Sequence, residues 1–177
     1  EFNQTFNIEL KEPISIIEKA IEDKIFPGAQ LFISKDDDIL INNGYGKLTY
    51  DVESPSVTIN TIYDVASITK VLAATPIIMK LLQKKRIGLN FPLSDFYPAF
   101  NKNLKKDVTI RHLLTHTSGI KSYIEYYKKP GFDSKEKIVE DIINQKLEYI
   151  PDSEVVYSDL GIILLTDIIE KITKNSL

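Results

Sequence analysis

The chain has 177 residues, of which 43% are hydrophobic and 27% are charged, and it contains no cysteine. This composition is that of one globular domain and excludes intrinsic disorder, because aliphatic residues recur throughout and the net charge is only −3. The 22 Lys+Arg and 25 Asp+Glu residues give no basic excess for nucleic-acid binding, and the lack of cysteine excludes a disulfide scaffold and a thiolate zinc site.

The first sixty residues predict a helix followed by a β-hairpin. Apolar residues recur at helical spacing over 13–25, with Pro13 in the first turn. Two β-rich runs, 29–34 and 39–45, flank a polar turn, and 46–60 is expected to be a loop or edge segment. A lone two-stranded hairpin is marginal in water, so we expect its sheet to have more strands than this chain supplies and the sequence to be incomplete.

From Ser67 onward the sequence predicts mostly helices. A long apolar helix is expected over 67–86, interrupted by Pro76, which removes a backbone hydrogen bond. An irregular segment follows over 89–107. Three further helices are predicted, at 110–114 with Thr109 as its cap, at 133–146 and at 158–173. No apolar stretch reaches the roughly 18 residues of a membrane span.

A hydroxyl and an amine meet where the long apolar helix begins. Ser67 and Lys70 are spaced i and i+3, which makes them neighbours on one helical face. If Ser67 opens the helix, its backbone N–H points outward at the positive helix end and can stabilise a developing oxyanion. Burial of Lys70 near that positive end would lower the pKa of Lys70, because both burial and like charge disfavour the ammonium form. Lys70 is then expected to accept the Ser67 proton, as covalent acyl transfer requires.

The Ser-x-x-Lys spacing is weak evidence by itself, because it occurs three times in this chain. The other two pairs are Ser118 with Lys121 and Ser134 with Lys137. The first of these falls in a turn, and the second falls in the charged first turn of an amphipathic helix. Only Ser67 and Lys70 open a long apolar helix. A lysine there would be partly buried, which is unfavourable for a charged side chain and therefore indicates a function.

Two histidines, His112 and His116, are spaced i and i+4 and could share a metal on one helical face. The glutamate of the zinc-protease motif is missing, because Leu113 and Leu114 occupy the positions between them. Hydrogen bonding at a helix end is therefore favoured over metal binding. No metal and no cofactor are predicted.

Several blocks in order resemble a known superfamily. The run 62–70, Ile-Tyr-Asp-Val-Ala-Ser-Ile-Thr-Lys, resembles the first active-site motif of serine β-lactamases and penicillin-binding-protein-like proteins, in particular the branch of class C β-lactamases, esterases and D-alanyl-D-alanine peptidases. Further similar blocks are 26–29, 89–98, 109–119 and 157–159. The last, Tyr-Ser-Asp, would by itself be a helix cap, but it stands where the family places its second motif.

The resemblance implies a role for each residue of these motifs. Ser67 is implied to be the acylated nucleophile, Lys70 its partner base, and Tyr157 the phenol that moves the proton between Ser67 and the leaving group. Asp159 matches a position that is often Asn and is implied to contact the substrate or Lys70. A carboxylate at that position favours a charged Lys70 over an unprotonated one.

The resemblance also implies an α/β (α+β) β-lactamase-like fold that is present in part. Residues 1–61 would form the N-terminal helix and sheet strands, and 62–177 most of the helical subdomain with the first and second motifs. The family's third motif, a Lys-Thr-Gly-like or His-x-Gly triplet on a later strand, has no counterpart after Tyr157. We therefore expect an N-terminal fragment that is inactive in isolation.

The implied parent protein is a serine hydrolase that acts through an acyl-enzyme on an ester, a cell-wall peptide or a β-lactam. Its partner would be a small-molecule or peptidoglycan-derived acyl substrate, with no nucleic acid, and a fusion to a glycoside-hydrolase domain is possible. The alternatives are an acyl-binding or sensing module without turnover and an inactive truncation on the same scaffold. A periplasmic or secreted location is implied, although no signal peptide is recognised in this chain.

Overall fold

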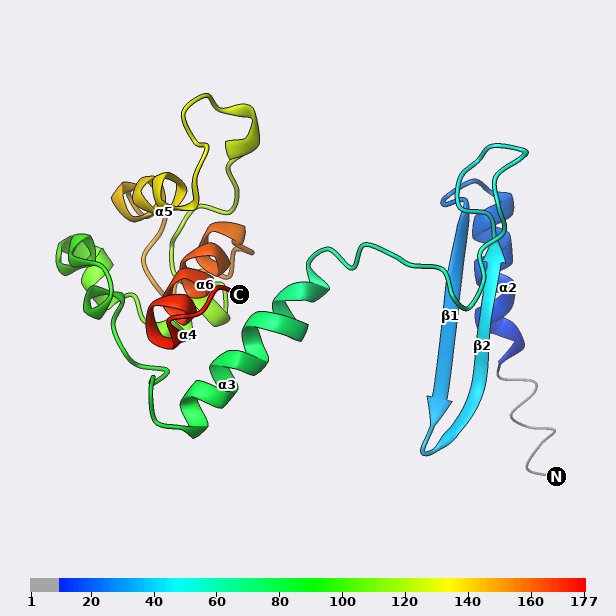
Figure 1. Ribbon diagram of the computed structural model, residues 1–177, viewed down its shortest axis with the longest axis horizontal. Coiled ribbons are helices and arrows are strands. Elements are labelled where there is room, and N and C mark those ends of the chain that lie inside the picture. The colour runs from blue at the N-terminus through cyan, green and yellow to red at the C-terminus, as the bar shows by residue number, and fades with distance from the viewer. Residues whose placement is uncertain (1–9) are drawn as a thin grey trace. The chain divides into compact units, whose positions relative to one another are not determined.

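The computed structural model describes residues 10–177, which form two compact units that divide between Asp64 and Val65 (Figure 1). The first unit contains a helix and a hairpin, and the second is mainly helical. This mixture of helix and strand agrees with the fold class predicted from the sequence. Among the described residues, no helix is both long enough and apolar enough to cross a membrane.

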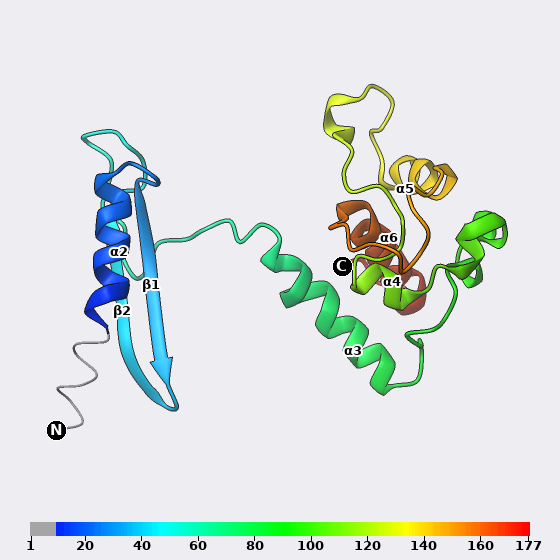
Figure 2. The ribbon, with the colours of Figure 1, turned by 180° about the vertical axis from the view of Figure 1, so that it is seen from behind.

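The first unit consists of helix α2 (Lys11–Glu22) and the antiparallel strands β1 (Gly28–Lys35) and β2 (Asp38–Gly46). Helix α2 packs beside the hairpin in both views (Figures 1 and 2). The hairpin predicted from the sequence is confirmed, with a register irregularity between Ile33 and Ser34. The helix begins two residues earlier than predicted and ends three residues earlier, at Glu22.

The second unit is organised around helix α6 (Asp159–Thr173), seven of whose residues are buried. Helices α4 (Ile110–Leu114) and α5 (Lys135–Asn144) pack against it (Figure 1). Helix α6 is apolar on most of its sides, as the sequence predicted, and this explains why it lies in the core rather than at the surface. The hydrophobic core of the unit includes Leu164 and Ile168, both fully buried.

The long helix after Ser67 is interrupted by a π-helical turn. Segment η1 (Lys70–Ala74) is π-helical and continues into helix α3 (Thr75–Gln83), which ends three residues before the predicted end. The N–H of Thr75 bonds to the carbonyl of Lys70, five residues earlier. Pro76 has no N–H and clashes with the carbonyl four residues before it in a regular α-helix. The wider π turn just before Pro76 accommodates this constraint.

The remaining connections are short 3₁₀ turns and capped loops. The 3₁₀ turns are η2 (Leu93–Asp95), η3 (Pro98–Asn101), η4 (Asn103–Asp107) and η5 (Tyr126–Lys128). The first three fill the segment that was predicted to be irregular. Thr109 caps α4 as predicted, and Ser134 caps α5, because its hydroxyl accepts the N–H of Lys137 at 3.4 Å.

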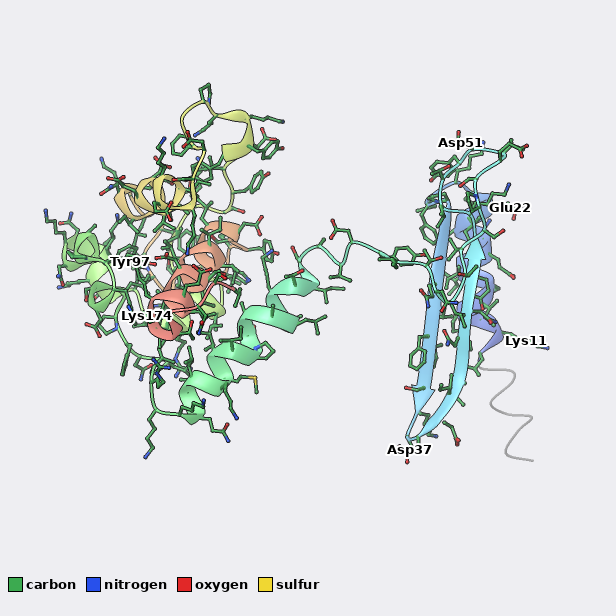
Figure 3. All side chains as sticks on the ribbon, in the orientation of Figure 1. Lys11, Glu22, Asp37, Asp51, Tyr97 and Lys174 are labelled. Atoms are coloured by element: carbon green, nitrogen blue, oxygen red, sulfur yellow. The ribbon has the colours of Figure 1, made fainter. Side chains whose placement is uncertain are left out.

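A buried carboxylate joins three elements of the second unit. Asp167 of α6 accepts a hydrogen bond from the hydroxyl of Tyr97 at 2.7 Å (Tyr97 is labelled in Figure 3). Lys171 and Lys135 lie 2.8 and 3.1 Å from its carboxylate oxygens. Burial raises the pKa of Asp167, but the hydrogen bonds from these three partners outweigh burial and hold the pKa below its ordinary value. The carboxylate therefore stays ionised in the core at neutral pH.

The central position of α6 makes its buried leucines sensitive to truncation. Leu164→Ala is expected to lower the free energy of unfolding by about 2–5 kcal/mol, because the variant loses apolar burial and leaves a cavity in the core. Urea unfolding followed by circular dichroism measures the loss. Leu104→Ala is the matched control, since Leu104 is 47% exposed, and it should cost less than about 1 kcal/mol. Equal losses in the two variants would contradict the placement of the core.

Candidate active site

Ser67 lies in the turn that opens the long helix of the second unit. The backbone N–H groups of residues 68–70 bond back to the carbonyls of residues 65–67, so the helix begins immediately after Ser67. Ala66 has a φ of +42°, in the left-handed region that residues other than glycine rarely adopt. Such a conformation persists only where its surroundings impose it. The backbone before Ser67 is therefore a constrained segment.

The hydroxyl of Ser67 is contacted by two of the residues that the sequence singled out. Lys70 Nζ donates a hydrogen bond to Ser67 Oγ at 2.8 Å, and the Tyr157 hydroxyl lies 2.7 Å from the same oxygen. Asp159 Oδ1 lies 2.8 Å from Lys70 Nζ. The structure thus brings all four predicted site residues into one continuous chain of polar contacts: Tyr157, Ser67, Lys70 and Asp159.

The start of α6 places Tyr157 and Asp159 beside this hydroxyl. Ser158 caps the helix, because its Oγ accepts the N–H of Gly161 at 3.0 Å and donates to the carbonyl of Lys121 at 2.8 Å. Ser122 Oγ donates to the carbonyl of Tyr157 at 2.6 Å. Ser158 is therefore the residue of the Tyr-Ser-Asp block that caps the helix. The carboxylate of Asp159 is not the cap and pairs with Lys70 instead.

The charge of Lys70 differs from the first expectation drawn from the sequence. Burial lowers the pKa of Lys70, as expected, but the hydrogen bonds to Asp159 and Tyr157 and the negative charge on these groups outweigh burial and raise the pKa above its ordinary value. The expectation of a lowered pKa, drawn from burial and the helix end, was wrong, whereas the expectation that a carboxylate at position 159 favours a charged Lys70 agrees with this shift. Lys70 is an ammonium ion at neutral pH.

Tyr157 shows the opposite shift. Hydrogen bonding with Lys70 and with Ser67 lowers the pKa of the Tyr157 phenol, and the positive charge of Lys70 adds to this effect. Burial and the charge of Asp159 act against it, and the net shift is downward. The Tyr157 side chain is 47% exposed, so solvent screens these effects in part. The phenol is therefore the group next to Ser67 whose proton is made easier to remove.

The other candidate pairs from the sequence have structural contacts. Ser118 is buried and accepts the N–H of Ile120 at 3.2 Å, while Ser134 caps α5. The ring of His112 accepts the N–H of Thr109 at 3.0 Å and lies 3.0 Å from Asp152. These contacts agree with the interpretation of the two serines and of His112 as structural residues.

His116 lies beside the site, which the sequence did not predict. Its ring centroid is 4.7 Å from that of Tyr157, and its Nδ1 accepts the N–H of Ser158 at 3.1 Å. Ser122 was also missed. Both residues contact the 157–158 segment from positions 35 and 42 residues earlier in the chain, and no local pattern indicates contacts at that separation.

The resemblance implies that a strand after the second motif forms one edge of the site around Ser67. Within residues 10–177 the strands are β1 and β2, and both precede Ser67. After Tyr157 the chain forms α6 and a short terminal turn. The later strand that the resemblance assigns to the other edge of the site is not among these elements.

The sequence as a whole matches the family model named Beta-lactamase over residues 14–177. Protein flp of Staphylococcus aureus (strain NCTC 8325 / PS 47) is 33% identical over 169 residues, which cover 92% of this chain and 33% of flp. A protein of Salmonella paratyphi B (strain ATCC BAA-1250 / SPB7), named as a D-alanyl-D-alanine carboxypeptidase, is 32% identical over 84% of this chain and 38% of its own length. The chain therefore spans between 33% and 38% of the length of these curated relatives.

Solved structures agree with this match. The octameric penicillin-binding protein homologue from Pyrococcus abyssi is 30% identical and superposes with a TM-score of 0.74, over 94% of this chain and 40% of that one. A class C β-lactamase mutant superposes with a TM-score of 0.77 at 20% identity, over 95% of this chain and 45% of that one, which is a likeness of fold. The chain belongs to the Beta-lactamase family, and both the resemblance and the fold predicted from its motifs are confirmed. The family is one of serine hydrolases.

The downward shift of the Tyr157 pKa depends first on Lys70. Lys70→Met keeps the length of the side chain but removes its charge and its hydrogen bonds, so the pKa of Tyr157 is expected to rise. The measurement is a spectrophotometric titration of tyrosinate, in which the same protein with Tyr157→Phe is subtracted to isolate one of the nine tyrosines. Lys80→Met, an exposed lysine of α3, is the control and should leave the titration unchanged. An unchanged pKa in Lys70→Met would contradict the contact.

Proposed function

We propose that this protein is a serine acyl hydrolase that forms a covalent ester on Ser67. The observation that supports this proposal most directly is the hydrogen bonding of one serine hydroxyl to both an ammonium group and a phenol of lowered pKa. A serine is a weak nucleophile until an adjacent base removes its proton. Here Tyr157 is that base, and Lys70 is the cation that makes its phenolate accessible.

The proposed acylation proceeds in two proton transfers. The Tyr157 phenolate accepts the proton of Ser67 while Oγ attacks the carbonyl carbon of the substrate, and the backbone N–H of Ser67 stabilises the resulting oxyanion. The Tyr157 hydroxyl then returns the proton to the leaving group as the carbonyl re-forms and the bond to that group breaks. Lys70 remains protonated throughout, because its charge stabilises the phenolate.

Deacylation repeats these steps with water as the nucleophile. Tyr157 accepts a proton from water, the hydroxide attacks the acyl-Ser67 carbonyl, and the proton passes to Ser67 Oγ as it leaves. This step separates a hydrolase from an acyl-binding module on the same scaffold, which would be acylated at Ser67 and would release product only once. Release of product beyond one equivalent indicates the hydrolase.

For the substrate we propose an acyl compound of the cell wall or a related small molecule: a D-alanyl peptide, an ester or a β-lactam. The relative named as a D-alanyl-D-alanine carboxypeptidase and the penicillin-binding protein homologue support this range. We further propose a periplasmic or secreted location, because family members often act there and peptidoglycan lies there. Cell fractionation tests the location.

Ser67→Ala is expected to abolish covalent labelling of the protein by a fluorescent penicillin and by a p-nitrophenyl ester, because the variant has no attacking oxygen. Intact mass measurement after labelling, followed by peptide mapping, identifies the modified residue. Ser134→Ala is the matched control, since Ser134 has the same Ser-x-x-Lys spacing but caps α5. It should be labelled like the wild type. The assay uses a form of the protein that includes the strand of the third motif, because residues 1–177 alone are expected to be inactive. In that form, labelling that persists in Ser67→Ala, or wild-type protein that neither probe labels, would contradict the proposed function.

Asp159→Asn is expected to shift the pH dependence of labelling toward lower pH. The charge of Asp159 raises the pKa of both Lys70 and Tyr157, so its removal lowers both. The phenolate then forms at lower pH, and Lys70 loses its proton at lower pH. The measurement is the labelling rate constant as a function of pH, with Asp133→Asn as the control, because Asp133 pairs with Lys137 on the surface. Superimposable profiles for Asp159→Asn and the wild type would exclude this role.

A further inference from the structure

We propose that His116 is a positioning residue for Tyr157, whose phenol it holds against Ser67 with a neutral imidazole. This inference rests on the proposed function, because the value of the position lies in the proton transfer at Ser67. His116 does not contact Ser67 in the structure. It acts through its contacts with three consecutive residues, 156–158.

His116 contacts these three residues with three different groups. Its carbonyl oxygen accepts the N–H of Val156 at 3.0 Å, and its Nδ1 accepts the N–H of Ser158 at 3.1 Å. Between them, the ring of Tyr157 packs on the imidazole with a centroid separation of 4.7 Å and a tilt of 38°. The backbone on both sides of Tyr157 and the Tyr157 ring are therefore held by one residue.

The backbone of His116 is itself in an uncommon conformation. Its φ is +57°, in the left-handed region where histidine, asparagine and aspartate occur more often than other non-glycine residues. The carbonyl that accepts the N–H of Val156 also accepts the hydroxyl of Tyr149 at 3.3 Å. The left-handed backbone of His116 costs free energy, and it occurs where His116 contacts the segment that carries Tyr157. Strained backbone of this kind is often found at functional sites.

The hydrogen bond from Ser158 requires a neutral imidazole. Because Nδ1 accepts a backbone N–H, the single proton of the neutral ring is on Nε2, and a second proton on Nδ1 would break that hydrogen bond. The groups that act on the ring are Tyr157, Lys70 and Asp159, while the hydroxyl of Tyr149 donates to the backbone carbonyl of His116. Burial lowers the pKa of His116 and the charge of Lys70 lowers it further, while Asp159 raises it. The net lowering keeps the ring neutral at pH 7.

This arrangement predicts an acid limb in the pH dependence of Ser67 acylation. Below the pKa of His116, the imidazole gains a proton and the hydrogen bond from Ser158 breaks, so one of the contacts that position Tyr157 is lost. This loss adds to the decrease that protonation of Tyr157 itself causes. Acylation therefore decreases as pH falls through a pKa below 6.5, the ordinary value for histidine. The protein has two histidines, so proton NMR resolves both rings, and His112→Asn assigns them.

Two substitutions separate the functions of the ring. His116→Ala removes both the acceptor and the packing surface, whereas His116→Asn places an amide oxygen near the position of Nδ1 and tolerates the left-handed backbone. With a fluorescent penicillin as the probe, His116→Ala should lower the maximal labelling rate constant by about 10- to 100-fold, since the base is misplaced, with little change in the half-saturating concentration. His116→Asn should recover most of the rate and lose the part of the acid limb that His116 adds, because asparagine does not titrate, while the decrease caused by protonation of Tyr157 remains.

A second measurement does not depend on activity. The tyrosinate titration of Tyr157, isolated by subtracting Tyr157→Phe, should move to higher pKa in His116→Ala, because the released phenol loses its contacts with Lys70 and Ser67. His112→Asn is the matched control, since the His112 ring contacts Thr109 and Asp152 instead. Circular dichroism establishes that each variant is folded.

The outcomes separate this inference from the proposed function. If the wild type is not labelled but the Tyr157 titration shifts in His116→Ala, the hydrolase proposal fails and the positioning role stands. If the wild type is labelled at Ser67 but both the rate and the Tyr157 titration are unchanged in His116→Ala, the positioning role is overturned. If His116→Ala does not fold, an acid limb that persists unchanged in His116→Asn overturns it.

Discussion

Lys70 and Asp159 meet at 2.8 Å from the first turns of two different helical segments, and this ion pair acts on the charges of Lys70 and Tyr157, the two groups that contact the Ser67 hydroxyl. The Lys70 side chain is only 20% exposed, so burial alone would favour its neutral form. The carboxylate and the Tyr157 phenol reverse that preference and keep the ammonium. The ammonium in turn lowers the pKa of Tyr157, so the phenol that contacts Ser67 is coupled through Lys70 to the carboxylate of Asp159.

The ion pair requires that two loops hold the start of α6 in place. The segments around residues 116–122 and 148–158 are joined by hydrogen bonds, including Glu148 N–H to the carbonyl of Gly119 at 2.8 Å and Asp159 N–H to that of Ser122 at 2.8 Å. Gly119 has a φ of +77°, and a Cβ at this position would lie 2.3 Å from the carbonyl oxygen of Tyr149. Only glycine permits this close approach. The two loops therefore meet at Gly119, the last residue of the block 109–119 that resembles the family.

The sequence predicted the features that depend on neighbours in the chain. Helical and strand periodicity predicted the hairpin, α4 and α6, and the i and i+3 spacing placed Lys70 beside Ser67. Tyr157 was identified only through the family resemblance, because it is 90 residues from Ser67. The direction of the Lys70 pKa shift could not be derived from neighbouring residues either, because Asp159 is also far from Lys70 in the sequence. The sequence predicted an interruption of the helix at Pro76 but not a π turn. Pro76 excludes a regular α-helical pattern of backbone hydrogen bonds, but it does not specify which pattern replaces it.

Asp159 occupies a position at which one charge has two effects. It lies in the first turn of α6, where the positive end of the helix stabilises a carboxylate. The same carboxylate neutralises Lys70, so the resting site contains one cation and one anion beside a neutral phenol. Loss of the Tyr157 proton then gives the site a net negative charge. The Lys70 ammonium and the positive N-terminus of α6 lie beside that charge. A neutral amide at position 159 would lack the negative charge of Asp159. Removal of the Tyr157 proton would then bring the site to neutrality, which is why the residue at this position sets the pH at which the phenolate forms.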